Sequence, residues 1–215
     1  MSGQFISIEG GEGVGKSTQA RLLAERLRAA GRTVVEVREP GGTLVGDRIR
    51  EILLDPAVTM NARTELFLYE AARAELTTTV IVPALAQDEV VVCDRFFDSS
   101  TAYQGYARGI NADVVRSLNL SATAGVCPDL TLLLYLETEE ALVRATRGGA
   151  DRIEAESLDF HRAVTEGFAA IAAAEPDRIV WVDASGTVED VAARVWMAVV
   201  LHPAGEHAID GWPKS

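Results

Sequence analysis

The stretch "FISIEGGEGVGKST", residues 5–18, decides the fold. A short apolar run leads into a glycine-rich segment, in which four residues separate Gly10 from Gly15-Lys16-Ser17. This spacing matches the phosphate-binding loop G-x-x-x-x-G-K-[ST], which lies between a strand and a helix. A dinucleotide-binding loop does not fit, because its third glycine would fall at Lys16. The stretch therefore predicts a strand, a phosphate loop and a helix, in that order.

The chemistry of such a loop explains its residue types. Glycines let successive backbone N–H groups face one anion, and the N-terminus of the following helix adds a partial positive charge. We expect Lys16 to reach the β- and γ-phosphates of a nucleoside triphosphate, and Ser17 to ligate Mg²⁺. The expected triphosphate-binding residues are Gly10, Gly11, Glu12, Gly13, Val14, Gly15, Lys16, Ser17 and Thr18.

The composition fits one acidic domain. The chain has 215 residues, 48% of them hydrophobic, and a net charge of −12. This charge argues against binding to nucleic acid or to an anionic membrane, because both need a basic surface. No apolar run approaches the roughly 18 residues of a membrane span, and the N-terminal residues lack the pattern of a signal peptide. We therefore expect a cytoplasmic protein without nucleic-acid or membrane partners.

The hydrophobic pattern predicts an α/β fold with a five-stranded parallel sheet flanked by helices. Continuous apolar runs, rather than alternating ones, indicate strands that are buried on both faces. Helical stretches separate these runs, as right-handed crossovers require. The expected strands are residues 4–9, 33–38, 89–94, 130–137 and 179–184. We expect a single domain over residues 1–201, followed by a C-terminal tail, 202–215.

Polar segments follow four of the expected strands, and ligands bind at that edge of such sheets. After the phosphate loop come "REPGG" (38–42), "DRFFDSSTAYQG" (94–105) and "RATRGGADRIE" (144–154). Arg95 at the end of a strand can grip a phosphate or carboxylate with two parallel bonds, or it can pair with a structural Asp94. Tyr69 and Arg73 are four residues apart, so a helix would place them on one face. Both side chains would then face a flat base, or one would lie in the hydrophobic core and the other at its solvated rim.

The phosphate loop alone does not name the reaction. No Asn-Lys-x-Asp base-reading motif is present, and the one Asp-x-x-Gly, at 183–186, follows the last strand. A chain this short is typical of small-molecule kinases. A kinase for another nucleotide or small acid, and a non-catalytic triphosphate-binding module, both remain open at this point.

Taken together, five segments resemble the bacterial thymidylate kinases, from about residue 4 to 200. They are "IEGGEGVGKST", "REPGGT" with "IREILL", "TELFLYEAAR", "DRFFDSSTAYQGYARG" and "RGGADRIE". The resemblance implies a P-loop kinase fold with a short lid at about 144–154, and usually a homodimer. It also implies phosphoryl transfer from ATP to dTMP with Mg²⁺, giving ADP and dTDP.

The resemblance assigns roles on the acceptor side. Arg95 holds the dTMP phosphate, Tyr69 stacks on thymine in place of the family's usual Phe, and Arg73 donates to a thymine carbonyl. The implied dTMP-binding residues are Glu12, Glu39, Arg50, Tyr69, Arg73, Arg95, Ser100, Tyr103 and Gln104.

The phosphate loop contains no arginine, so the chain resembles the lid-arginine type of the family. The lid carries Arg144, Arg147 and Arg152. We expect Arg147, which would also contact ATP, or Arg152 to reach the transferred phosphoryl group, and Glu12 to face the acceptor. The expected catalytic residues are Glu12, Lys16, Arg95, Arg147 and Arg152.

Overall fold

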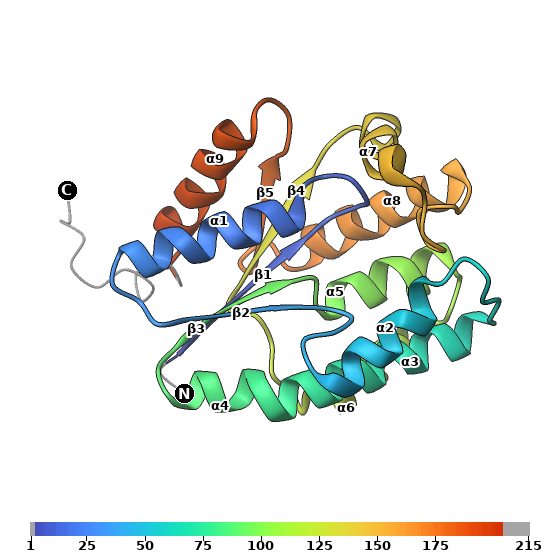
Figure 1. Ribbon diagram of the computed structural model, residues 1–215, viewed down its shortest axis with the longest axis horizontal. Helices are drawn as coiled ribbons and strands as arrows, with labels where there is room; N and C mark the ends of the chain where they lie inside the picture. The colour runs from blue at the N-terminus through green and yellow to red at the C-terminus, as the bar shows by residue number, and fades with distance from the viewer. Residues whose placement is uncertain (1–2, 204–215) are drawn as a thin grey trace.

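The computed structural model describes residues 3–203, and these contain a five-stranded parallel sheet (Figure 1). The strand order is β2-β3-β1-β4-β5, so the strand that precedes the phosphate loop is central. The strands are β1 (Gln4–Glu9), β2 (Val34–Arg38), β3 (Val90–Asp94), β4 (Leu130–Tyr135) and β5 (Ile179–Asp183). All five lie within two residues of the predicted runs, which confirms the predicted sheet.

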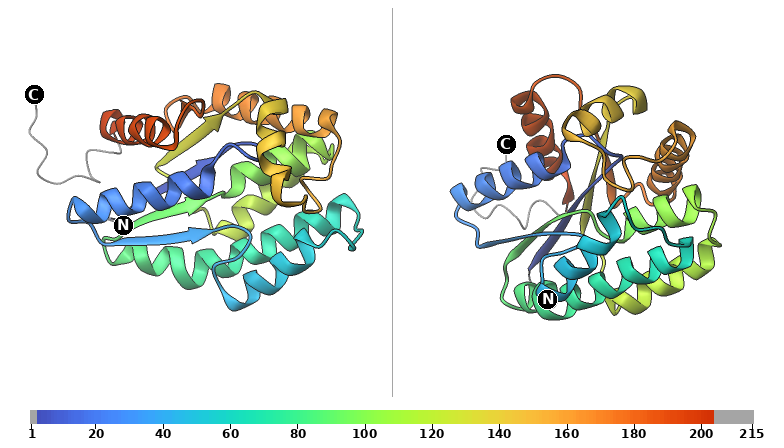
Figure 2. Two further views of the ribbon diagram at one scale, coloured as in Figure 1. Left: turned by 45° about the horizontal axis from the view of Figure 1, so that its top comes forward. Right: turned by 45° about the vertical axis from the view of Figure 1, so that its right-hand side comes forward.

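Helices cover both faces of the sheet (Figures 1 and 2). Strand residues of one face, such as Ile8 and Leu132, pack against α1 and α9. On the other face, Phe5 and Cys93 pack toward α3 and α4, while Leu133 packs toward α8. The α-helices are α1 (Lys16–Ala29), α2 (Leu44–Leu54), α3 (Ala62–Leu76), α4 (Val82–Ala86), α5 (Phe97–Ser100), α6 (Ala112–Thr123), α7 (Thr138–Ala145), α8 (Leu158–Ala174) and α9 (Val188–Leu201).

Three shorter helical segments extend these helices. They are the π-helical turns η1 (Thr77–Ile81) and η2 (Thr101–Ala107), and the 3₁₀ turn η3 (Thr146–Gly148). A continuous helical stretch runs from α3 through η1 into α4, past Pro83. Pro83 stands at the start of α4, directly after the π-helical turn η1.

The sequence reading missed one complete helix, α6. Its start is a regular N-cap, since the Asn111 side chain accepts from the amides of Asp113 and Val114. Its buried residues Val115, Asn119 and Thr123 follow the helical spacing, but two of the three are polar, so the apolar pattern is weak. Of the two cysteines, Cys93 is buried and Cys127 is exposed.

The register of the sheet brings the predicted motifs to one edge. Ile8 of β1 pairs with Asp94 of β3, so the phosphate loop and the Asp94-Arg95 pair begin at neighbouring points. Arg38 of β2 pairs with Asp94 from the other side, which adds the segment after β2. The tail expected from 202 lies outside the described residues from 204 onward. None of the described helices is long and apolar enough to span a bilayer.

Candidate active site

The phosphate loop, residues 10–18, turns sharply between β1 and α1. Gly13 and Gly15 have φ angles of 71° and 93°, which residues with a Cβ rarely adopt. At Gly13 a Cβ atom would also collide with the Ala141 carbonyl of α7. Lys16 begins α1, and its Nζ donates to a carbonyl of the loop. The backbone is therefore the one that the motif predicts.

Ser17 and Asp94 meet where α1 starts and β3 ends. The Ser17 hydroxyl donates to Asp94 Oδ2, while Asp94 Oδ1 is buried and has no hydrogen-bond partner among the described residues. A hydroxyl beside a carboxylate with a spare oxygen suits Mg²⁺, which takes few protein ligands next to substrate phosphates. Within residues 3–203 no three acidic, His or Cys side chains are grouped to hold a metal by themselves. Ser17, the Mg²⁺ ligand expected from the sequence, and Asp94 are therefore together suited to hold Mg²⁺.

Arg95 links the phosphate loop to the segment after β3. Its Nη2 donates to Glu12 Oε1 at 2.7 Å and to the Tyr103 hydroxyl at 3.1 Å. Its Nη1 donates to the Gly10 carbonyl at 3.0 Å and to the Ser99 hydroxyl at 3.1 Å. The Tyr103 hydroxyl in turn donates to Glu12 Oε1 at 2.7 Å. Glu12 therefore faces Arg95 and Tyr103, as expected of a residue on the acceptor side.

The backbone of Arg95 is also unusual. Its φ of 69° lies in the left-handed region, which costs a residue with a side chain roughly 1–2 kcal/mol. The Arg95 amide donates to the Ile8 carbonyl at 3.0 Å, so the turn is held against β1. Backbone outliers of this kind concentrate at functional sites.

Two cavities open at this edge of the sheet. The larger, which we call the loop cavity, has a volume of about 670 Å³ and is lined by the phosphate loop, α1, the end of β2 and the lid. The smaller, the acceptor cavity, has a volume of about 80 Å³ and is lined by residues of α2, α3 and the segment after β3. The two cavities share Glu12, Glu39, Arg50, Arg95 and Asp151.

Eight of the nine expected acceptor residues line the acceptor cavity. They are Glu12, Glu39, Arg50, Tyr69, Arg95, Ser100, Tyr103 and Gln104. Ser100 Oγ and Glu39 Oε1 are buried and lack hydrogen-bond partners among the described residues. Buried polar atoms are normally paired, so these two atoms mark positions where a ligand would bond. Gln104 Nε2 donates to Glu65 Oε1 at 2.9 Å, which orients its amide.

Arg73, the ninth expected acceptor residue, does not line the cavity. Its side chain is 1% exposed, and it forms ion pairs with Glu39 at 2.8 Å and with Glu70 at 2.7 Å. It also donates to Asn119 Oδ1 at 3.1 Å and to the Phe96 carbonyl at 3.3 Å. Tyr69, four residues before Arg73 on α3, lines the acceptor cavity, but two carboxylates hold the Arg73 guanidinium behind its wall. These contacts do not support direct donation to a base.

The three lid arginines have different surroundings. Arg144 lines the loop cavity and pairs with Glu140 at 2.6 Å. Arg147 is exposed and, within residues 3–203, has no recorded hydrogen bond or ion pair. Arg152 points away from the loop cavity, because its Nη1 pairs with Glu65 at 2.6 Å and its Nε donates to the Leu53 carbonyl at 2.6 Å. In this arrangement neither Arg147 nor Arg152 lines either cavity.

Some lining residues were not predicted. Arg38 and Asp47 line the loop cavity, and Ile153 lines the acceptor cavity. Arg38 is the last residue of β2 and opens the "REPGG" segment, so its place at the carboxyl end of the strand was a usable signal. Asp47 carries no such signal, because only the packing of α2 against the sheet edge brings it to a cavity; Ile153 lies in the expected lid segment, but as an apolar residue it was not expected to line a cavity.

Burial and charge set the ionisation of the central groups. Burial alone would raise the pKa of Glu12, but Arg95 and Lys16 lower it to about 2. Burial, and then Arg95, lower the pKa of Lys16 to about 8. Burial raises the pKa of Glu39 to about 7, against the opposing effect of Arg73. The free site thus holds a firmly ionised Glu12 beside a lysine that titrates close to neutral pH.

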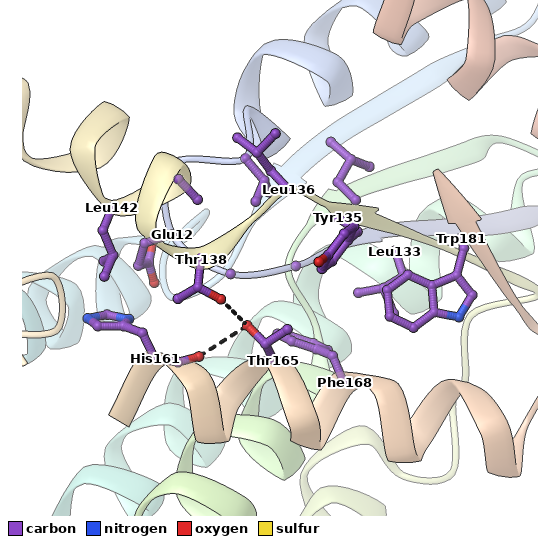
Figure 3. Close-up of a pocket in the computed structure, with 15 residues that line it drawn as sticks. Glu12, Leu133, Tyr135, Leu136, Thr138, Leu142, His161, Thr165, Phe168 and Trp181 are labelled. Carbon is purple, nitrogen blue, oxygen red and sulfur yellow. Dashed lines mark hydrogen bonds between the residues drawn. The ribbon is translucent and has the colours of Figure 1, made fainter. Parts of the chain in front are cut away.

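A third, small cavity lies behind the phosphate loop (Figure 3). Leu133 and Tyr135 of β4 and Phe168 of α8 supply much of its wall, and Thr165 on α8 bonds Thr138 at 3.2 Å across it. Its volume of about 20 Å³ has room for roughly one water molecule. This cavity is therefore too small for a nucleotide, and it belongs to the packing that supports the loop.

Comparisons with known proteins agree with the geometry. The family model of thymidylate kinase matches residues 8–195. A thymidylate kinase of Synechococcus sp. (strain JA-3-3Ab) is 54% identical over 197 residues, covering 91% of this chain and 94% of the relative. The thymidylate kinase of Deinococcus radiodurans is 48% identical over 198 residues, covering 92% of this chain and 96% of the relative.

A solved structure shows the same fold. The crystal structure of thymidylate kinase from Ehrlichia chaffeensis superimposes with a TM-score of 0.75 at 32% sequence identity. The match covers 91% of this chain and 97% of the solved one. The P-loop kinase fold expected from the motifs is thereby confirmed. The chain belongs to the thymidylate kinase family.

Proposed function

We propose that this protein transfers the γ-phosphoryl group of ATP to dTMP, giving ADP and dTDP. The observation that carries the proposal is the meeting of two cavities at Glu12 and Arg95. Phosphoryl transfer needs a donor and an acceptor held in line, with cations beside both, more than it needs covalent chemistry. In this proposal the loop cavity holds the phosphoryl donor, ATP, and the acceptor cavity holds dTMP.

On the donor side, backbone N–H groups of the phosphate loop would bind the ATP phosphates. Lys16, buried at the start of α1, would exchange its contact with the loop carbonyl for the β- and γ-phosphates. Ser17 and Asp94 would hold Mg²⁺. The bound Mg²⁺ would neutralise phosphate charge during the transfer.

On the acceptor side, Arg95 would bind the dTMP phosphate with its fixed guanidinium. Arg50, which donates to the Pro40 carbonyl at 3.0 Å, lines the same wall and adds a second cation. Both substrates are anions, and these arginines offset the repulsion that would otherwise separate them.

Base recognition would come from Tyr69, Gln104 and Ser100. The Tyr69 ring offers a stacking surface in the acceptor cavity. Since Gln104 commits its NH₂ group to Glu65, its carbonyl oxygen can accept from the N3–H of thymine. Cytosine has an acceptor at that position and would be rejected. Arg73 would support this wall by holding Glu39, rather than by touching the base.

The test is a panel of acceptors with ATP and Mg²⁺, followed by release of ADP and by identification of the product. We expect dTMP to be the best acceptor, and dUMP, which lacks one methyl group, to be about 10–200-fold poorer. Lys16→Ala and Arg95→Ala are the controls, and both should lose most activity. Fastest turnover of AMP, CMP or shikimate, or ATP binding without acceptor-dependent ADP release, would contradict the proposal.

We also infer that the protein forms a homodimer through α2, α3 and α6. Helix α3 packs against both of the others, and they lie together in Figure 1. All three expose large apolar side chains, namely Leu44, Val45, Ile52, Phe67, Val114 and Leu120. Exposed apolar residues gathered on neighbouring helices are typical of an association surface. A cytoplasmic location, expected from the sequence, stays a prediction.

A further inference from the structure

Glu9, the last residue of β1, is a buried carboxylate that lines neither of the two substrate cavities. Its side chain is fully buried, with 0% exposure. Its Oε1 accepts from the Phe96 amide at 2.7 Å and from the Ser99 amide at 3.4 Å. Its Oε2 accepts from the Ser99 hydroxyl at 2.6 Å. All three donors lie in the short segment that follows Arg95.

The Ser99 hydroxyl connects Glu9 to the guanidinium of Arg95. A serine hydroxyl has one hydrogen to donate, and here it goes to Glu9. The oxygen atom is then left to accept, and it accepts from Arg95 Nη1 at 3.1 Å. Because a free hydroxyl rotates, its direction depends on a strong acceptor on the far side. Glu9 is that acceptor.

Glu9 also helps to hold the unusual backbone of Arg95. The Arg95 amide bonds the Ile8 carbonyl at 3.0 Å, and the next amide, of Phe96, bonds Glu9 at 2.7 Å. Two consecutive amides are thus tied to two consecutive residues of β1. A left-handed φ at a residue with a side chain persists only where the surroundings hold it in this way.

We propose that Glu9 is a positioning residue for Arg95, acting through the Ser99 hydroxyl and the Phe96 amide to aim the guanidinium at the acceptor phosphate. The inference rests on the proposed function, in which Arg95 receives that phosphate. Three donors converge on Glu9, which suits an ionised carboxylate. Burial, and then Asp98, raise its pKa to about 7, while Arg95 opposes that rise, so the ionised form that accepts from all three donors is favoured above neutral pH.

The alternative is that Glu9 only ties β1 to α5 and has no effect on the reaction. Loss of such a tie would lower stability and would affect both substrates alike. A positioning role makes a narrower prediction, because the loss should fall on dTMP and should depend on Ser99.

The experiment is a double-mutant cycle with Glu9→Gln and Ser99→Ala. Glutamine keeps the shape of Glu9 but presents an NH₂ donor to Ser99, whose hydroxyl then turns its hydrogen toward Arg95. We expect each single variant to lower kcat/KM for dTMP by roughly tenfold, with KM for ATP within twofold of wild type. The double variant should be about as impaired as either single one. Multiplied effects in the double variant, or equal changes for ATP and dTMP, would overturn the inference.

A second comparison covers the case in which Glu9→Gln does not fold. Ser99→Thr retains the hydroxyl that Ser99→Ala removes, so it should recover most of the loss in kcat/KM for dTMP. Equal impairment of the two Ser99 variants would overturn the inference. A wild-type enzyme without dTMP turnover would instead refute the proposed function, so the two failures are distinguishable.

Discussion

Glu12 of the phosphate loop contacts Arg95 and Tyr103, and we propose that it serves the acceptor side. Its Oε1 is held at 2.7 Å by both Arg95 and the Tyr103 hydroxyl. Substitution by Gln removes the negative charge and weakens both contacts. We expect KM for dTMP to rise about tenfold, with KM for ATP nearly unchanged, as measured by steady-state kinetics. Glu25→Gln, at an exposed pair on α1, is the matched control. A loss confined to ATP affinity would contradict this assignment.

Lys16 predicts a pH dependence of ATP binding. In the free protein its pKa is lowered to about 8, chiefly by burial. Bound phosphates favour the charged form and raise the pKa again, so binding takes up a proton above pH 8 and affinity falls as pH rises. Titration calorimetry from pH 7 to pH 9.5 should show this weakening for wild type. Lys16→Met should bind weakly at every pH, and a flat wild-type profile would count against the prediction.

Single residues differ in how well the sequence predicts them. The loop residues and Arg95 follow from local spacing, because the strand and the turn that position them are local too. Arg73 shows the limit of such reasoning. It lies four residues after Tyr69 on α3 and has a local i, i+3 partner in Glu70, but its pairing with Glu39 comes only from the packed structure. Charge pairing across elements therefore decides which arginine meets the ligand.

At the scale of elements, the lid between α7 and α8 carries two arginines, Arg147 and Arg152, either of which the sequence allowed to be the catalytic arginine. Arg152 is already bound to Glu65 and to the Leu53 carbonyl, so it ties the lid to α2 and α3. Arg147 has no such contact within the described residues. Closure of the lid could therefore bring Arg147 to the phosphates without breaking an ion pair, and we infer that Arg147 is the catalytic arginine.

This assignment predicts different effects for the two arginines. Arg147→Ala should lower kcat by on the order of 10³-fold, with little change in KM for dTMP and in the melting temperature. Arg152→Ala should lower the melting temperature by several degrees, because it leaves the buried Glu65 with one cation fewer. The reverse pattern in kcat would show that Arg152 is the catalytic arginine.

Elements were predictable where the hydrophobic pattern was strong. The three central strands, β1, β3 and β4, are buried on both faces and read as continuous apolar runs, and the edge strands β2 and β5 carry the same apolar pattern although they are only partly buried. Helix α6 was missed because two of the three side chains that it buries, Asn119 and Thr123, are polar, while the apolar Val114 and Leu120 are exposed on its outer face. When the exposed face of a helix is apolar, the sequence lacks the usual contrast between an apolar buried face and a polar exposed face. Such a helix is recognised only when the partner surface that covers its exposed face is also known.

For the whole molecule, the exposed apolar side chains of α2, α3 and α6 are the basis of the proposed homodimer. Phe67 on α3 is 56% exposed, which is unusual for so large an apolar side chain outside an interface. Phe67→Asp should convert a dimer to a monomer in sedimentation velocity runs. Met197→Asp on α9, also exposed, is the control and should leave the dimer intact. A wild-type protein that sediments as a monomer at micromolar concentration would contradict the proposal.

The central claim is that the loop cavity and the acceptor cavity are the donor and acceptor sites of one reaction. It is tested most directly by a crystal structure of the protein with dTMP, Mg²⁺ and a non-hydrolysable ATP analogue. We predict that the dTMP phosphate lies about 2.7–2.9 Å from the Arg95 guanidinium, with the analogue on the phosphate loop. A dTMP molecule bound away from Arg95, or one whose phosphate points away from the loop cavity, would contradict the account.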